Sequence, residues 1–176
     1  MTSQITCRIC ISGNAAVDRI FAEALTRLEA ARLDPNIKFP IAHVFFGHPN
    51  FELLPSPQIL RLIETSTYEF TFECTSEPDE FLQYLIGKIS QIDPCCYVEN
   101  FAYEDEYRKT YQLAWLAKSG PKVETRSFWL EMPDEDDFAD SDDFEEARIK
   151  EHEQTDHLID EAREEIFSLA YSDWES

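Results

Sequence analysis

The residues whose types and spacing most resemble a reactive site lie in the last third of the chain. His152-Glu153 is followed by His157, which looks like the His-Glu-x-x-His motif of zinc proteases. The two histidines are five residues apart, so on a helix they point about 140° away from each other and cannot share a metal. Glu153 and His157 are instead spaced as surface partners one helical turn apart. We therefore expect no zinc site here.

A calcium loop is the second chemistry that the acidic residues suggest. Counted from Asp134, the ligand positions 1, 3 and 12 of an EF-hand loop carry Asp134, Asp136 and Glu145. Position 5 is Phe138, and position 6, where the loop needs glycine to turn, is Ala139. Because the pattern fails at the turn, we expect no dedicated metal site.

The cysteines offer a third chemistry, as redox or zinc ligands. Cys7 and Cys10 have redox-motif spacing, but they fall in a predicted strand, where residues three apart face opposite sides. Cys95-Cys96 does not supply the second pair of a zinc ribbon. Five cysteines, an odd number, fit buried, reduced thiols in a cytosol. No constellation indicates catalysis, so we predict neither an enzyme nor a cofactor.

Carboxylates near the C-terminus form the remaining group. Residues 131–176 contain 19 acidic and three basic residues, a net charge of −16, whereas residues 1–130 contain 17 acidic and 12 basic ones, a net charge of −5. Such a segment repels nucleic acid and anionic membranes and attracts basic protein surfaces. The predicted partner-binding residues are Asp134, Glu135, Asp136, Asp137, Asp140, Asp142, Asp143, Glu145, Glu146 and Glu153.

This acidic segment has three interpretations from sequence alone. It is a solvated, solubilising face, or a DNA-like array of charge, or a surface that binds a basic protein without mimicry. Duplex DNA carries one charge per ~1.7 Å of axis, and the proteins that bind it present matching rows of Lys and Arg. A helix lined with carboxylates could occupy such a row in competition with DNA.

Hydrophobic periodicity predicts the elements that position these residues. In chain order we expect a strand at 5–12, a helix from Asn14 to about Asp34, an edge strand at 37–46, a short helix at 56–64, a strand at 68–74, a helix with a capping box at Ser76 and Asp79 that ends at Asp93, and a strand at 95–103. This β-α-β-β-α-β order is the split βαβ, or ferredoxin-like, arrangement.

A β-hairpin and a long acidic helix complete the predicted α+β fold. The hairpin comprises strands at 107–118 and 123–130 around the turn Ser119-Gly120-Pro121. The helix should run from Phe144 to Tyr171, with its polar middle, 150–157, projecting into water. The residues expected to dock on a body, in the same chain or by exchange in a homodimer, are Leu158, Ile159, Ile166, Phe167 and Leu169. We divide the chain into a ferredoxin-like body, 1–130, and an acidic linker and helix, 131–176.

Aromatic residues are frequent on the predicted sheet. They are Tyr97, Phe101, Tyr103, Tyr107, Tyr111, Trp115, Phe128 and Trp129. RNA-binding modules of this topology stack bases on sheet aromatics, but the net charge of −21 opposes contact with nucleic acid. We expect most of these rings in the core and an exposed subset as anchors for a protein partner.

At this point a family resemblance emerges. The strand YEFTFEC, the helix after it, the strand ending NFAYEDE and the hairpin YQLAWLAKSG resemble the YubB-like family, ferredoxin-like proteins of unknown function on plasmids and phages. The resemblance covers about residues 5–130 and rests on element order and a loose Tyr-Glu-Asp-Glu…Gly pattern. It implies a mobile-element context and supplies no catalytic residues.

Together these features favour an acidic cytosolic protein that inhibits by binding. The expected partner is the basic, nucleic-acid-binding surface of a nuclease or CRISPR-type effector, as in anti-CRISPR or anti-restriction counter-defence. The alternatives are an immunity protein or antitoxin that neutralises a basic toxin, and a structural or adaptor protein of a mobile element. The sequence shows neither a signal peptide nor an apolar run long enough for a membrane span, so we expect no membrane partner.

Overall fold

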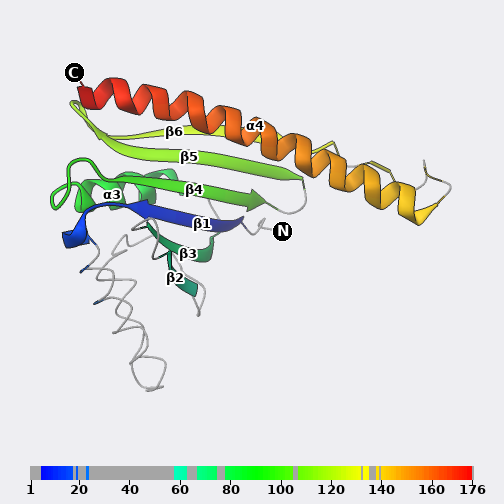
Figure 1. Ribbon diagram of the computed structural model, residues 1–176, viewed down its shortest axis with the longest axis horizontal. Coiled ribbons are helices and arrows are strands. Elements are labelled where there is room, and N and C mark those ends of the chain that lie inside the picture. Colours follow the sequence, from blue (N-terminus) through cyan, green and yellow to red (C-terminus); the bar gives the residue numbers. More distant parts are fainter. Residues whose placement is uncertain are drawn as a thin grey trace, which may run out of the picture.

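One antiparallel sheet with a helix on each face organises the part of the chain that the computed structural model describes (Figure 1). The described residues are 5–17, 19, 23, 58–62, 67–74, 78–104, 107–131, 133, 134, 138 and 140–175. The elements are β1 (Ile5–Ser12), β2 (Gln58–Leu62), β3 (Thr67–Cys74), α3 (Asp79–Ile89), β4 (Tyr97–Glu104), β5 (Arg108–Ala117), β6 (Gly120–Trp129) and α4 (Ser141–Glu175). The α+β class, the antiparallel sheet and the C-terminal helix are thus confirmed.

The six strands lie in the order β2-β3-β1-β4-β5-β6, and every neighbouring pair is antiparallel. β1 is central and pairs with β3 on one side and β4 on the other. Its burial alternates strictly, because successive side chains of a strand point to opposite faces. The predicted strands at 5–12, 68–74 and 95–103 and the hairpin strands are therefore confirmed to within a few residues.

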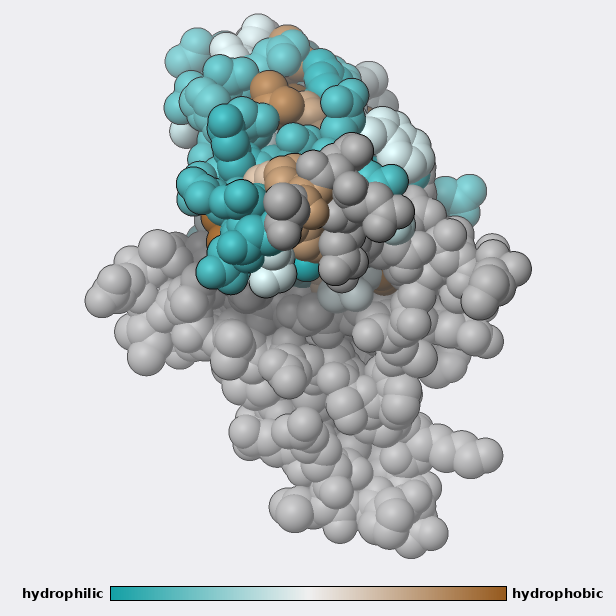
Figure 2. Space-filling view, turned by 90° about the vertical axis from the view of Figure 1, so that its right-hand side faces the viewer, coloured by the Kyte–Doolittle hydropathy of each residue, from teal (hydrophilic) through white to brown (hydrophobic). Residues whose placement is uncertain are grey.

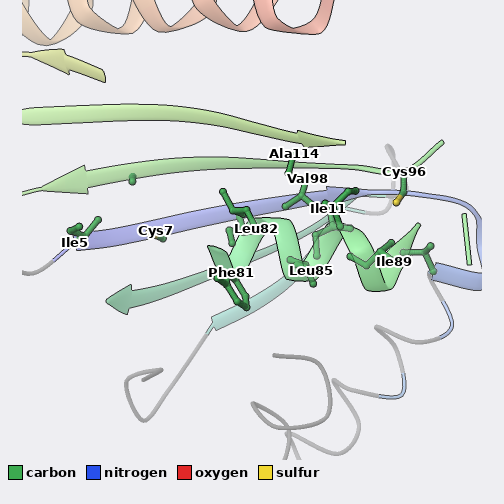
Figure 3. Close-up of a cluster of buried hydrophobic side chains, with 14 residues drawn as sticks. Ile5, Cys7, Ile11, Phe81, Leu82, Leu85, Ile89, Cys96, Val98 and Ala114 are labelled. Atoms are coloured by element: carbon green, nitrogen blue, oxygen red, sulfur yellow. The ribbon is translucent and has the colours of Figure 1, made fainter. Parts of the chain in front are cut away.

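The main core fills the space between the sheet and α3 (Figure 3). Ile5, Cys7, Ile9 and Ile11 of β1 are almost fully buried there. They meet the apolar face of α3, whose buried residues recur at helical spacing and are Phe81, Leu82, Leu85, Ile86 and Ile89. Burial of this apolar surface is the dominant stabilising term for the α3 side of the sheet.

Three local predictions are wrong. Residues 58–62 form β2 and pair with β3, whereas a short helix at 56–64 was expected. A helix that short is marginal in water, and the backbone of β3 offers hydrogen-bonding partners instead. The capping box also fails, because α3 begins at Asp79 with Pro78 at the N-cap position and no side-chain cap.

The third error concerns the hairpin turn. Ala117 pairs with Gly120, which leaves Lys118-Ser119 as a two-residue loop and places Pro121 inside β6. Gly120 has φ +115°, a conformation that favours glycine.

The predicted strand at 37–46 and most of the predicted helix after Asn14 lie outside the described residues; residues 15–17 are helical.

A second cluster holds α4 against the opposite face of the sheet. Tyr111, Leu113 and Trp115 of β5 are fully buried beneath it. The buried stripe of α4 consists of Thr155, Ile159, Ala162, Ile166 and Ala170. Of the predicted docking residues, Ile159 and Ile166 are buried and Phe167 is partly buried, but Leu158 and Leu169 are exposed, because they lie on one flank of the stripe. The docking takes place within one chain.

The polar middle of α4 also contacts the sheet, so the prediction that it projects into water is wrong. Thr155 is only 2% exposed. The Lys109 ammonium, whose side chain is 7% exposed, lies 2.6 Å from Asp156 Oδ1 and donates to the carbonyl of His152 at 3.4 Å. A buried ammonium needs acceptors, and this part of the helix supplies them without any apolar residue.

Glu99 of β4 is the buried acid at the centre of the α4 interface. Its side chain is 7% exposed, and Arg163 Nε and Nη2 lie 2.5 and 3.2 Å from its two oxygens. The hydroxyl of Tyr111 donates to the same carboxylate at 3.0 Å. The hydrogen bond from Arg163 to Glu99 raises the pKa of Arg163, and burial, followed by the charge of Glu99, raises the pKa of Tyr111. The charge of Glu99 is compensated by Arg163 only while α4 is docked.

We predict that Arg163→Gln lowers the free energy of unfolding by about 2–3 kcal/mol. The loss stays below the 3–5 kcal/mol of a fully buried pair because Arg163 is 45% exposed. Urea unfolding followed by far-ultraviolet circular dichroism measures it. Arg148→Gln is the matched control, since its partly exposed pair with Glu145 is worth less than about 1 kcal/mol. Equal losses for the two variants would refute a special role for Glu99.

Candidate protein-binding interface

The structure places most of the predicted partner-binding acids on exposed positions. Of the ten, the exposed ones are Asp134, Asp140, Asp142, Asp143, Glu145, Glu146 and Glu153. The other three, Glu135, Asp136 and Asp137, lie outside the described residues. The exposed acids thus extend from the connector into the first half of α4.

The first turns of α4 extend beyond the point at which β5 begins (Figure 1). We call residues 141–150 the arm. Asp140 starts it, because its carboxylate accepts from the Asp142 N–H at 3.0 Å, and acidic residues in the first turn suit the helix dipole. Phe138 packs against Phe144, with ring centroids 5.8 Å apart. Viewed from this end, the described surface is mainly hydrophilic (Figure 2).

The acids of α4 that face the sheet are each matched by a group of the body. Asp156 pairs with Lys109, and Glu165 lies 3.3 Å from Arg126 Nη2. Asp173 accepts from Trp115 Nε1 at 2.9 Å and lies 3.9 Å from Lys122. These pairs remove repulsion between α4 and the sheet and lower the negative charge that the three carboxylates present to a partner.

The outward face of α4 carries the acids without such a match. Six of them have no cationic partner in the described part of the chain: Asp142, Asp143, Glu146, Glu153, Asp160 and Glu164. Glu145 is offset by Arg148 at 3.3 Å and Glu161 by His157 at 3.5 Å when that histidine is protonated. The helix therefore sorts its charge into a compensated inner side and an anionic outer side.

Sequence reasoning missed Asp160, Glu161 and Glu164 as members of this surface. The signal was present, since the apolar residues at 159, 162, 166 and 170 fix the inner stripe, and 160, 161 and 164 fall on the opposite side. The pairing expected between Glu153 and His157 is also wrong, because His157 approaches Glu161 instead. Both pairs have the same spacing, so sequence cannot choose between them.

The cysteines behave as thiols in different environments. Cys7 is buried and Cys10 half-buried, on opposite faces of β1 as predicted. Cys96 is buried and Cys95 is exposed, so the expectation of buried thiols is wrong for Cys95. Burial raises the pKa of Cys96 to about 12, with a further contribution from the charge of Asp93. Asp93 accepts from the N–H groups of Asn14 and Cys95, which ties the start of β4 to the end of β1.

The sheet aromatics divide into core and surface. Tyr111 and Trp115 are buried under α4, whereas Tyr103, Tyr107 and Trp129 are exposed. The exposed three lie around the β4–β5 turn, since Tyr103 pairs with Lys109 and Arg108 pairs with Trp129. Arg108 stacks over the Trp129 ring, 5.5 Å from its centroid. Lys109 faces α4 and Arg108 faces the other way, so Tyr103 and Trp129 lie on opposite faces at this end of the sheet.

No group of three His, Cys, Asp or Glu side chains within the described ranges could hold a metal ion. The helices of these ranges include none with the length and apolar character of a membrane span. The chain matches no protein-family model, no curated protein and no solved structure.

We predict that iodoacetamide alkylates Cys95 at least tenfold faster than Cys96 in the folded protein at pH 8. The thiolate is the nucleophile, and a pKa of about 12 leaves Cys96 with roughly one thiolate in 10⁴ at that pH. Fragmentation mass spectrometry at successive times distinguishes the two adjacent sites. In urea the two rates should converge, and comparable rates in the folded protein would contradict the burial of Cys96.

Proposed function

We propose that this protein inhibits a basic nucleic-acid-binding protein, such as a nuclease or a CRISPR-type effector, by occupying its basic surface with the outer side of α4. The observation that carries the proposal is the sorting of charge on α4. The sheet neutralises the inner acids, and the outer acids remain available to a partner.

The geometry of the outer side supports competition with nucleic acid. Between Asp142 and Glu164, the six unmatched carboxylates occupy about 33 Å of helix axis, or about one per 5–6 Å. One DNA strand carries a phosphate every ~3.4 Å. A helix held by a packed sheet presents this array with little loss of entropy on binding, and the net charge of −21 accelerates encounter with a basic surface.

The ferredoxin-like assignment is part of the same proposal. The strand order β2-β3-β1-β4 and the antiparallel pairing support a split βαβ body, to which β5 and β6 add a hairpin beside β4. The resemblance to YubB-like proteins stays a prediction, and with it the setting on a phage or plasmid and the location in a host cytosol. This setting favours counter-defence as the biological role.

An immunity protein or antitoxin is the second candidate. The exposed Tyr103, Tyr107 and Trp129 favour it, because aromatic anchors dominate the affinity of protein interfaces. In that case a basic toxin would bind the β4–β5 end of the sheet, and α4 would contribute mainly to the rate of association.

We predict that the protein displaces duplex DNA from at least one member of a panel of purified restriction and CRISPR nucleases. Fluorescence anisotropy of a labelled duplex measures the displacement, with a mobility shift to detect ternary complexes. Raising the salt should weaken the inhibition, because exposed charges are screened over ~8 Å at physiological ionic strength. Displacement of DNA from no nuclease, or simultaneous binding of DNA and this protein at one site, would refute the proposal.

Two charge-matched variants locate the interface on α4. They are Asp142→Asn/Asp143→Asn/Glu146→Gln on the arm and Asp160→Asn/Glu161→Gln/Glu164→Gln on the central part. Each exposed pair is worth about 0.5 kcal/mol, so each variant should weaken competition about tenfold. Glu80→Gln, at an exposed acid of α3, should leave it unchanged. Loss of binding in Tyr103→Ala/Trp129→Ala, with both α4 variants at full affinity, would favour the antitoxin alternative.

A further inference from the structure

The outer strand β6 leaves one side of its backbone without a partner strand in the described part of the chain. It is ten residues long and, among the described strands, pairs only with β5. The pairing is continuous from Gly120 to Trp129, with no bulge. A long, regular edge of this kind is a template for another strand.

The hydrogen-bond pattern tells which groups of β6 point to the free edge. The Leu130 N–H donates to the Tyr107 carbonyl at 2.8 Å and extends the β5–β6 ladder. Counting back in steps of two, Phe128, Arg126 and Glu124 direct their backbone groups toward β5. Val123, Thr125, Ser127 and Trp129 therefore direct theirs outward. Pro121 also falls on an outward position, where its missing N–H removes no bond to β5.

The side chains of β6 on the α4 face carry a self-complementary order of charge. Lys122, Glu124 and Arg126 alternate in sign on this face, and Lys122 and Arg126 approach Asp173 and Glu165 of α4. When two copies of β6 lie antiparallel about Thr125, Glu124 of each copy stands opposite Arg126 of the other. Thr125 then meets Thr125 as a hydrogen-bonded pair, and Val123 meets Ser127 in the same way.

Other symmetric registers are worse. Centring the pair on Glu124 sets Glu124 against itself and Lys122 against Arg126, which are repulsive pairs. Centring it on Val123 sets Pro121 opposite Thr125 at a hydrogen-bonded position, where proline has no N–H to donate. The Thr125-centred register alone among these combines opposite charges with complete backbone pairing at its centre.

The flank of α4 beside β6 is also the part of the helix that tolerates a second copy. Glu165 and Asp173 on this flank are matched by Arg126 and Lys122. Leu158 and Leu169, seven residues before and four after Glu165, share its side of the helix and are exposed. The unmatched acids Asp160 and Glu164 lie away from this flank.

We propose that two copies of this chain associate through β6, antiparallel and centred on Thr125, to form one continuous sheet. The two-fold axis runs perpendicular to the sheet, so both α4 helices lie on the same face and run antiparallel. The inference is independent of the proposed function, since it rests on the edge of β6 and not on the outer acids. It assigns to β6 a partner of defined chemistry, a second copy of the same strand.

A charge-swap pair of variants tests the register. Glu124→Arg places two arginines opposite each other at each charge pair of the dimer, and Arg126→Glu places two glutamates there, so each variant alone should be monomeric. Mixed in equal amounts, the two variants restore both opposite-charge pairs and should form a heterodimer, which native mass spectrometry identifies by its mass. Circular dichroism checks that each variant is folded. A monomeric wild-type protein at physiological salt, or homodimers of both variants, would overturn the proposal.

Amide hydrogen exchange of the wild-type protein gives a second test that needs no variant. At dimer-forming concentrations the outward amides of Thr125 and Ser127 should be protected, and dilution should release them. The amides of Glu124 and Arg126, which bond to β5, should remain protected at both concentrations and serve as the internal control. Rapid exchange of Thr125 in the dimer would place the interface elsewhere and overturn the proposal.

Discussion

The carboxylate of Glu99, buried under a helix that is itself strongly acidic, is the constraint on which this architecture depends. An unpaired carboxylate in that position would cost several kcal/mol, and a helix dense in carboxylates would increase the repulsion. Arg163 removes both difficulties at once, with two contacts to Glu99 and support from the hydroxyl of Tyr111. The orientation of α4 about its own axis follows, because only one rotation brings Arg163 to Glu99 and the stripe from Thr155 to Ala170 onto the sheet.

This rotation determines which acids are available to a partner. Once Arg163 faces Glu99, the remaining bases of the interface, Lys109, Lys122 and Arg126, approach Asp156, Asp173 and Glu165. These pairs are individually weak where they are exposed, so their main effect is to remove repulsion between the helix and the sheet. The outer acids are unaffected by docking. Folding thus turns a segment of uniform negative charge into a helix with a compensated side and an anionic side.

Sequence patterns predict an element when its own residues determine its environment. β1 is predictable because Ile5, Cys7, Ile9 and Ile11 alternate with polar residues, and α3 because its apolar positions recur at helical spacing. Residues 58–62 are not predictable in this way, since their extended conformation depends on the neighbouring backbone of β3.

The same limit applies to the candidate site. The exposure of the arm follows from composition, but the docking of 150–157 depends on Lys109, which is 47 residues away from its partner Asp156. No local pattern in a polar segment reports a contact with a distant cation. The exposed Cys95 next to the buried Cys96 is a similar case, because the turn before β4 decides which of two adjacent thiols faces the core.

The position of α4 over the last hairpin links the two proposed surfaces without making either depend on the other. α4 contacts β5 and β6, so its anionic side lies above the same edge of the sheet that β6 forms. If β6 pairs with a second copy, two anionic sides run antiparallel on one face of a continuous sheet. Such a pair can engage an elongated basic groove at two places, and the second contact then benefits from the high effective concentration created by the first. Monomeric chains would instead bind such a groove through single, screened contacts, with correspondingly shorter residence.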